Sequence, residues 1–343
     1  MTKFYVASPA NFETGGVELL HQLVYKLNKI KKNSAVIYYY NFIPTLHKNP
    51  TPLIYIKYTK GEYVTKIDEN YNNVLILPEI LISNILNYQN IRIAIWWLSV
   101  DNYFIRVGKK ISYKEYKKGK KYFFYKLLNY LNIYPSYTLN PFRKNILKSK
   151  NIILHLYQSE YARLYLKKHN FKQLLPLSDF LNDTFFQDKI RMQNRGDIIL
   201  YNPKKGIEIT RELIAFMPNY NWIALENYAP SEMKSWMIKS KIYVDFGNHP
   251  GKDRIPREAA INGCVVLTNK KGAANNCYDI PINEEYKFKD PIKEKEIFKD
   301  LVNNIYFDFE KHFQQFDFYR SKIKSEETIF EKELLIFYDK CWQ

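Results

Sequence analysis

The chain has 343 residues, of which 46% are hydrophobic and 17% aromatic, so it is not an intrinsically disordered protein. This length suits two α/β domains better than one ordinary core. The net charge is +17, and the three widely spaced cysteines fit neither a disulfide framework nor a zinc site. The N-terminus lacks a signal-peptide pattern and no apolar run reaches the roughly 18 residues of a membrane span, so we expect a cytoplasmic protein.

The first half alternates apolar strands with helical segments. A strand over 3–8 leads through Gly15-Gly16 into a helix over 17–30, whose apolar residues recur at helical spacing. Further strands are expected at 34–40, 74–77, 91–98 and 151–158, followed by a helix at 159–169 with Ser159 as its N-cap. Strand, glycine turn and helix form the pattern that opens a nucleotide-binding βαβ unit.

The second half repeats this alternation after a segment of turn-forming residues, 174–185, which we expect to be an interdomain hinge. Strands are predicted at 197–201, 222–225, 241–246 and 264–268. Helices are predicted at 207–216, at 231–240 with Ser231 as the N-cap, and at 256–262. The tail, 293–343, is expected to be helical. The alternation predicts an α/β fold with a doubly wound parallel sheet in each half.

Two glycine-containing turns follow predicted strands and could bind an anion. Gly15 and Gly16 open the first long helix, where backbone amides and the helix N-terminus favour negative charge. The second turn, Asn202-Pro203-Lys204-Lys205-Gly206, would project its lysines from the carboxyl edge of a sheet. An ammonium group there can stabilise a diphosphate as a leaving group. A plain tight turn and a solvated lysine pair are the alternatives that these residues leave open.

The densest group of polar residues lies in the loop after the predicted strand 241–246 and in the helix that follows. It supplies the candidates His249, Gly251, Lys252, Arg254 and Glu258. Glu258 could accept hydrogen bonds from ribose hydroxyls while Lys252 and Arg254 face phosphates. Alternatively, Glu258 only stabilises the positive end of its helix. Another glycine turn, at Gly272, follows the next predicted strand.

The second half resembles the C-terminal domain of GT-B glycosyltransferases, in particular the retaining group called family four. In that family a Lys-Gly pair opens a helix after a strand, as Lys205-Gly206 would here. A later stretch of the family is matched by Pro256, Glu258, Ala259, Gly263 and Val265. A Gly-Gly-x-Glu motif before a long N-terminal helix is matched by Gly15, Gly16 and Glu18. The three motifs occur in the family's order and together cover much of the chain.

The resemblance implies a GT-B fold, in which two Rossmann-like doubly wound domains face each other across a cleft. It implies an acceptor domain at 1–177, a nucleotide-sugar domain at 184–322, and a C-terminal helix, 323–343, that crosses back to the first domain. Glu258 would then bind the donor ribose, and Gly16 would bring its backbone against the phosphates. Lys205, together with Lys204 or Arg254, would bind the diphosphate. The turns and loops after the strands add Gly15, Asn202, Gly251 and Gly272 as further candidates for donor binding.

One position departs from the family pattern. The family carries a second glutamate eight residues before the ribose glutamate, and this position is Pro250 here. We expect the neighbouring His249, Gly251 and Lys252 to rebuild the sugar-facing loop, with His249 and Lys252 as catalytic candidates. The resemblance therefore does not carry over the identity of the donor sugar or the stereochemistry.

Asp101 follows an apolar strand that ends with Trp96 and Trp97, and it is the candidate to orient or deprotonate an acceptor hydroxyl. A turn or cap role for Asp101, and core packing for the two tryptophans, would explain these residues equally well. The six histidines show no metal-binding spacing, and no DxD-like pair stands on a loop. We therefore predict no metal and no cofactor apart from the nucleotide-sugar donor, with cationic side chains in the metal's place.

A basic and aromatic segment spans 106–150, with thirteen Lys and Arg residues against a single acid, Glu115. A helix in this segment would have an aromatic and leucine face with a cationic rim, as helices at membrane surfaces do. We expect it to dock the protein peripherally on an anionic membrane, where it would meet a saccharide or lipid-linked acceptor. A core helix with exposed lysines is the alternative, and nucleic acid is not expected because no RNA-binding signature occurs.

Together these patterns predict a metal-independent, hexosyltransferase-like enzyme of bacterial surface polysaccharide biosynthesis, such as capsule or lipopolysaccharide. It would move a sugar from a nucleoside-diphosphate sugar to a hydroxyl group. One alternative is a non-catalytic GT-B-like scaffold at a membrane or nucleic acid, which the missing glutamate favours. Another is a GT-B-shaped epimerase or phosphorylase.

Overall fold

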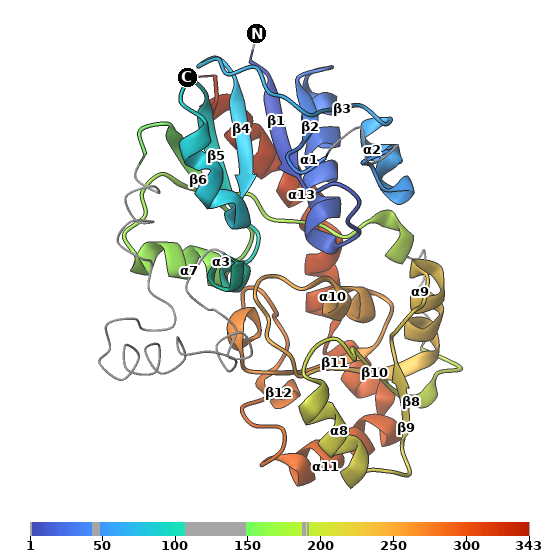
Figure 1. Ribbon diagram of the computed structural model, residues 1–343. Coiled ribbons are helices and arrows are strands. Elements are labelled where there is room, and N and C mark those ends of the chain that lie inside the picture. Colours follow the sequence, from blue (N-terminus) through green and yellow to red (C-terminus); the bar gives the residue numbers. More distant parts are fainter. Residues whose placement is uncertain (1, 43–48, 107–148, 187–189, 191, 343) are drawn as a thin grey trace, which may run out of the picture. The chain divides into compact units, whose positions relative to one another are not determined.

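The computed structural model describes residues 2–42, 49–106, 149–186, 190 and 192–342. The chain divides into two compact units. The first comprises Met1–Gln158, Ala162–Leu177 and Glu331–Gln343, and the second comprises Ser159–Tyr161 and Ser178–Phe330. Each unit is built on a parallel sheet with helices packed on it, which confirms the predicted fold class (Figure 1).

The first unit contains a seven-stranded parallel sheet in the order β3-β2-β1-β4-β5-β6-β7. Its strands are β1 (Phe4–Ser8), β2 (Ala35–Tyr39), β3 (Tyr63–Val64), β4 (Val74–Pro78), β5 (Arg92–Trp97), β6 (Ile152–Tyr157) and β7 (Leu174–Pro176). The chain runs outward in one direction through β2 and β3, and in the other through β4 to β7. The turn after β1 therefore lies at a topological switch point, where doubly wound sheets bind ligands.

The helices of this part of the chain connect the strands. They are α1 (Gly15–Ile30), α2 (Ile56–Thr59), α3 (Val100–Arg106) and α7 (Glu160–Lys168), with 3-10 turns at Leu53–Tyr55 and Glu79–Asn87. The side chain of Thr14 caps α1 by accepting a hydrogen bond from the amide of Val17 at 3.4 Å. Helix α1 packs its buried face against β1 and β2 (Figure 1).

The paired tryptophans belong to the core of the first unit. Trp96 and Trp97 are both fully buried. The indole of Trp96 donates to the carbonyl of Leu177 at 2.9 Å, and that of Trp97 donates to Nδ1 of His155 at 3.2 Å. Their polar atoms are thus satisfied inside the unit, and core packing accounts for the pair.

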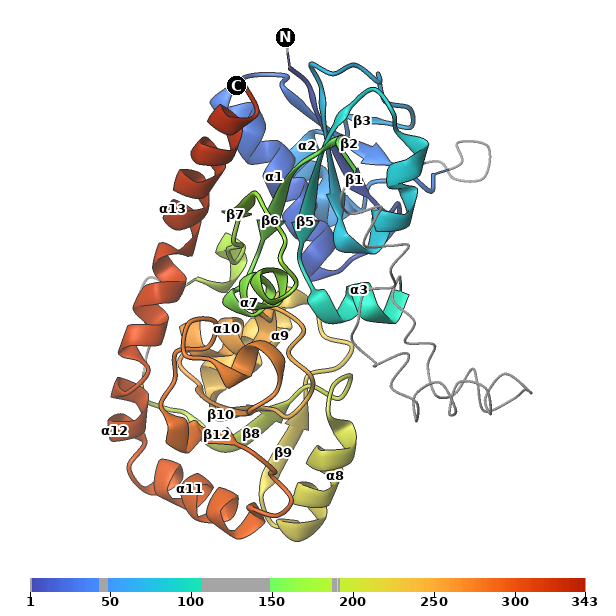
Figure 2. The same cartoon turned by 90° about the vertical axis from the view of Figure 1, so that its left-hand side faces the viewer.

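The predicted helical tail consists of α11 (Lys295–Phe307), α12 (Phe309–Gln314) and α13 (Asp317–Lys340). The last residues of the chain pack in the first unit. The ring of Phe337 lies 5.9 Å from that of Phe4, and Arg92 donates to the carbonyl of Cys341 at 2.6 Å. Figure 2 shows α13 as one long helix whose C-terminal turns lie beside α1.

The second unit contains a five-stranded parallel sheet in the order β12-β11-β10-β8-β9. Its strands are β8 (Gly196–Tyr201), β9 (Asn221–Ala224), β10 (Ser240–Asp245), β11 (Val265–Asn269) and β12 (Lys287–Phe288). Helices α8 (Ile207–Phe216), α9 (Pro230–Lys239) and α10 (Arg254–Ile261) connect them. Since the strand order reverses between β8 and β10, the turns after these two strands meet at a second switch point.

Three local predictions were wrong or incomplete. The expected hinge at 174–185 contains strand β7, whose proline is tolerated because β7 is the edge strand of its sheet. Helix α9 is capped not at Ser231 but at Ala229, whose amide donates to the side chain of Glu232 at 2.8 Å. Strands β3 and β12 went unpredicted because two residues are too few to show a period.

Among the described helices, none combines the length and the apolar character required to cross a bilayer. The predicted membrane-docking segment, 106–150, falls almost entirely outside the described residues, so its role stays a prediction.

A buried arginine ties the helix ends of the second unit together. Arg195 precedes β8 and is 8% exposed. Its guanidinium donates to the carbonyls of Met237 and Ser240 at 2.9 and 2.8 Å, and to that of Asn262 at 2.5 Å. These carbonyls lie at the C-terminal ends of α9 and α10, where the helices leave acceptors unpaired.

We predict that Arg195→Met lowers the free energy of unfolding by about 3 kcal/mol, because methionine fills the space but leaves these buried carbonyls without their donor. Urea unfolding of the two proteins measures the difference. Arg211→Met, on the exposed face of α8, is the matched control and should change stability by less than about 0.5 kcal/mol. Equal effects of the two substitutions would contradict the assignment.

Candidate functional site

Three turns meet at the carboxyl edge of the second sheet, and glycines let their backbones touch. A Cβ atom on Gly206, after β8, would lie 2.4 Å from the carbonyl carbon of Phe246, after β10. A Cβ on Gly272, after β11, would lie 2.0 Å from the carbonyl oxygen of His249. That oxygen also accepts a hydrogen bond from the amide of Ala273 at 2.8 Å. The backbones of three separate loops are thereby brought to one place, and the first two loops supply the side chains of Lys205, His249 and Asp253.

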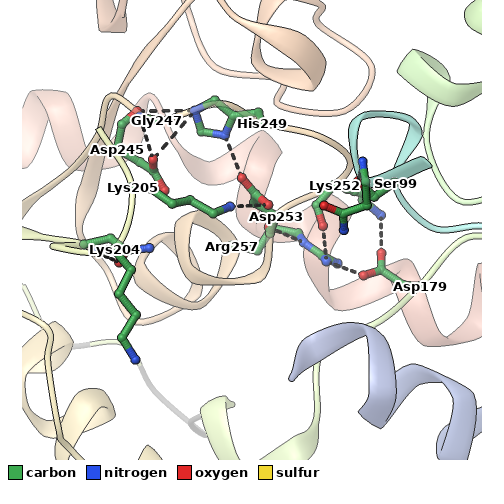
Figure 3. Close-up of polar contacts among 12 residues, drawn as sticks. Ser99, Asp179, Lys204, Lys205, Asp245, Gly247, His249, Lys252, Asp253 and Arg257 are labelled. Carbon is green, nitrogen blue, oxygen red and sulfur yellow. Dashed lines mark hydrogen bonds and ion pairs between the residues drawn. The ribbon is translucent and has the colours of Figure 1, made fainter. Parts of the chain in front are cut away.

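Of the two lysines predicted at the β8 turn, Lys205 points into this place. Its ammonium group donates to Oδ1 of Asp253 at 2.8 Å. The side chain of Asn202 shapes the turn by accepting from the amide of Lys204 at 3.0 Å. Figure 3 shows Lys205 directed toward Asp253 while Lys204 points away from it.

His249 lies between two carboxylates and is fully buried. Its Nδ1 is 3.0 Å from Oδ2 of Asp253, and its Nε2 is 3.3 Å from the carbonyl oxygen and 3.9 Å from Oδ1 of Asp245. Burial acts to lower the pKa of His249, but the hydrogen bond with Asp253 and the two negative charges outweigh it and raise the pKa above its ordinary value. We call Lys205, Asp245, His249 and Asp253 the switch-point cluster (Figure 3).

The two carboxylates of the switch-point cluster have opposite pKa shifts. Burial raises the pKa of Asp245, and the nearby positive charges offset this only in part. Burial acts in the same direction on Asp253, but its hydrogen bond with His249 and the charge of Lys205 outweigh it and lower the pKa. Asp245 also accepts from the amide of Gly247 and from the hydroxyl of Tyr243, both at 3.1 Å.

Asp245, His249 and Asp253 are close enough for a shared metal ion, since their ligand atoms lie within 4.8 Å of one another. Their arrangement does not fit one ion well. The two carboxylates flank opposite nitrogens of the imidazole, whereas a metal binds at one of them. In addition, the second oxygen of Asp253 is occupied by Lys205 at 2.8 Å. Ion pairing accounts for the group, and the absence of a metal stays a prediction.

The predicted ribose glutamate lies on α10, beside the switch-point cluster in the sequence. Glu258 is 5% exposed, and its Oε1 is 3.7 Å from Nε of Arg254, the first residue of the helix. Gly251, in the preceding loop, is buried. Glu258 and Arg254 thus form a loose ion pair one turn apart. Their contacts with a nucleotide remain predictions.

Lys252 belongs to a second group of charges, which we call the α10 quartet: Lys252, Arg257, Asp179 and Glu326. Arg257 donates to Asp179 at 2.5 Å and to Glu326 at 2.7 Å. Lys252 lies 2.7 Å from Glu326 and 3.6 Å from Asp179. Burial acts to raise the pKa of Asp179, but Arg257 and Lys252 outweigh it and hold the pKa low. The quartet joins α10 to the segment after β7 and to α13, so it orders the unit around the candidate site.

The candidates in the first unit lie at the carboxyl edge of its own sheet. Gly15 and Gly16 are the first two residues of α1, directly after the β1 turn, and Gly16 is exposed. Glu18, from the same motif, is buried and accepts from the hydroxyl of Tyr58 at 2.8 Å. Asp101 lies in the first turn of α3, after β5, and is half-buried. Nothing in these contacts assigns a ligand, so their roles stay predictions.

Sequence reasoning missed five charged residues that organise the site: Asp179, Asp245, Asp253, Arg257 and Glu326. A sequence signal existed for Asp245 and Asp253, because they stand four residues before and four residues after His249. Asp179 and Glu326 gave no signal, since each comes close to Arg257 only through the tertiary fold.

Comparison with solved structures places this fold. No protein-family model and no curated protein matches the sequence. The chain is similar to sucrose-phosphate synthase from Thermosynechococcus elongatus, with a TM-score of 0.67 over 100% of this chain and 99% of that chain, at 12% identity. It is also similar to Anabaena HepE in complex with UDP-glucose, with a TM-score of 0.56 over 99% and 100% of the two chains, at 10% identity.

A third similar structure is S. aureus TarM in complex with UDP, with a TM-score of 0.53 and 13% identity. The match covers 80% of this chain but only 56% of that one. At such low identities the matches show the fold alone, and this fold is the GT-B fold that the sequence predicts.

We predict that Arg257→Met destabilises the protein by about 3–5 kcal/mol, because it leaves two buried carboxylates facing a single ammonium group. Chemical unfolding measures the loss. The double variant Arg257→Met with Asp179→Asn, which leaves Lys252 and Glu326 as a balanced pair, should recover part of it. A single variant as stable as the wild type would show that the α10 quartet contributes nothing to folding.

Proposed function

Starting from the GT-B fold, we propose that this protein is a glycosyltransferase that moves a sugar from a nucleoside-diphosphate sugar to a hydroxyl group. One observation carries the proposal: the cationic, glycine-lined edge of the second sheet, where Lys205 lies at the switch point and Glu258 follows on α10. Phosphates of nucleotides bind at such edges in doubly wound folds. HepE with UDP-glucose and TarM with UDP support the class of donor.

In the proposed reaction, the bond between the anomeric carbon and the diphosphate oxygen breaks, and the diphosphate leaves with the electron pair. Lys205 and the amides at the start of α8 face the negative charge that develops on it. Glu258 accepts hydrogen bonds from the ribose hydroxyls. The acceptor oxygen forms the new bond to carbon, and its proton passes to a base, for which Asp101 is our candidate.

The proposal extends to the acceptor and the place of action. We propose a saccharide or lipid-linked acceptor of bacterial surface polysaccharide synthesis, met by a cytoplasmic enzyme docked peripherally on the inner face of the membrane. The sequence of 106–150 supports this, because its positive charges and aromatic residues suit an anionic lipid surface.

We predict that one nucleotide from a panel of UDP, GDP, ADP, CMP and TDP raises the melting temperature of the wild type, because ligands that bind only the folded state stabilise it. Lys205→Ala should weaken that nucleotide's affinity by about tenfold or more, through the loss of one charge-assisted contact with phosphate. Glu258→Ala should remove most of the shift as well. Thermal shift and calorimetric titration give the values.

The matched control is Lys241→Ala. Lys241 is paired with Asp197 in the same unit, but at the amino-terminal end of β10 rather than the carboxyl end. It should bind the nucleotide as the wild type does. Equal losses in the Lys205 and Lys241 variants, or none in either, would remove the switch point from donor binding. A nucleotide that binds without any sugar transfer to any acceptor would favour the non-catalytic scaffold.

We further predict that EDTA leaves nucleotide affinity and sugar transfer unchanged, because Lys205 supplies the positive charge that a divalent ion supplies elsewhere. The measurement is product formation in metal-free buffer, with and without added Mg²⁺ or Mn²⁺. A loss of transfer in EDTA that Mn²⁺ restores would overturn metal independence.

A further inference from the structure

We propose that His249 is a positioning residue. Its imidazolium neutralises Asp253, the carboxylate that orients Lys205. The positive charge of Lys205 therefore remains available to bind the donor diphosphate. This inference rests on the proposed function, because it concerns how Lys205 is prepared for that ligand. It assigns a role to a histidine that lies too deep to touch a substrate.

The contacts form a continuous chain from His249 to the carboxyl edge of the sheet. His249 is 0% exposed, so it can act on a ligand only through its neighbours. Its Nδ1 lies 3.0 Å from one oxygen of Asp253, and the other oxygen of Asp253 holds the Lys205 ammonium at 2.8 Å. Lys205 is the outermost member of this chain, with a side chain that is 34% exposed (Figure 3).

The balance of charge explains why this series of contacts requires His249 in its cationic form. The switch-point cluster contains two carboxylates and two groups that can carry a positive charge, so it is neutral when His249 is protonated. If His249 were neutral, Lys205 would be the one cation of the switch-point cluster left to pair with the carboxylate of Asp253. An incoming diphosphate would then compete with a carboxylate for that ammonium, and charge-assisted bonds of this kind are strong.

The groups around His249 define how this arrangement should respond to pH. Asp245 faces it from β10, Asp253 from the start of α10, and Lys205 from the β8 turn, while the β11 turn contacts the backbone of His249 through Gly272 and Ala273. Burial opposes the charged imidazole, but Asp253 and Asp245 outweigh it and raise its pKa. A raised pKa means that the cationic form persists above the usual range of histidine. Donor affinity should therefore fall as pH rises through the pKa of His249.

The test measures donor affinity between about pH 6 and pH 9 by calorimetry, with UDP-glucose, ADP-glucose and GDP-mannose as probes, because their diphosphates do not titrate in this range. The affinity of the wild type should fall about tenfold in one step as His249 loses its proton. His249→Gln, which cannot be charged, should bind about tenfold more weakly than the wild type at low pH and show no step.

The matched control is His312→Gln. His312 is a buried histidine of the same unit, but it is bonded to Tyr286 at 2.7 Å and not to the switch-point cluster. This variant should keep the wild-type step, even if its stability falls. A wild type that binds none of the probes would remove the proposed function and this inference together. The inference alone would be overturned by a different set of results. In that case the wild type binds a probe and Lys205→Ala weakens the binding, but wild type and His249→Gln have the same affinity at every pH.

A double-mutant cycle tests the route through Asp253. If His249 acts on Lys205 through this carboxylate, His249→Gln should cost no further affinity in an Asp253→Asn background. Additive losses would overturn the route. Without any ligand, NMR titration of His249 should show a higher pKa in Lys205→Ala than in the wild type, because a neighbouring positive charge has been removed. An unchanged pKa would equally overturn the coupling.

Discussion

The second unit depends on the contact of backbone with backbone at the carboxyl edge of its sheet. Neighbouring strands of a sheet lie about 4.7–4.9 Å apart, so the loops that follow them come into contact only where their side chains leave room. Here Gly206 and Gly272 have no Cβ, so the loop that carries His249 is closed in from both sides. Any larger residue would push the turns apart. The switch-point cluster can thus form because glycine occupies both of these positions.

Electrostatics then explains how so many charges can be buried beside one helix. The switch-point cluster and the α10 quartet each contain two acids and two basic groups, so each can be neutral. Isolated charges would cost several kcal/mol each to bury, and pairing with opposite charges offsets part of that cost. The two clusters have different roles. One reaches the switch point through Lys205, and the other ties α10 through Arg257 to α13 and to the segment after β7.

Features that depend on neighbouring residues could be predicted from the sequence, whereas contacts between distant parts of the chain could not. Strand and helix alternation is a local property, so the doubly wound sheets and most element positions were predictable. Motifs placed Lys205 after a strand end and Glu258 in the following helix, where the structure has them, but their roles in binding a nucleotide stay predictions. Strand β7 was missed because three residues ending in proline look like a turn. The partners of Arg257 come from distant parts of the chain, and only the packed structure brings them together.

The replacement at Pro250 now has a physical context. The carboxylates of this loop stand at 245 and 253: Asp245 faces His249, and Asp253 contacts both His249 and Lys205. Their ion-pairing partners are thus the cationic groups of the switch-point cluster. Recognition of ribose and diphosphate does not require a carboxylate at 250, but recognition of the sugar hydroxyls requires other hydrogen-bonding groups in its place. Under the proposed function, the sugar is therefore the part of the donor for which this chain should differ most from the family that it resembles. An enzyme and a nucleotide-binding scaffold built on this site would differ only in how they treat that sugar.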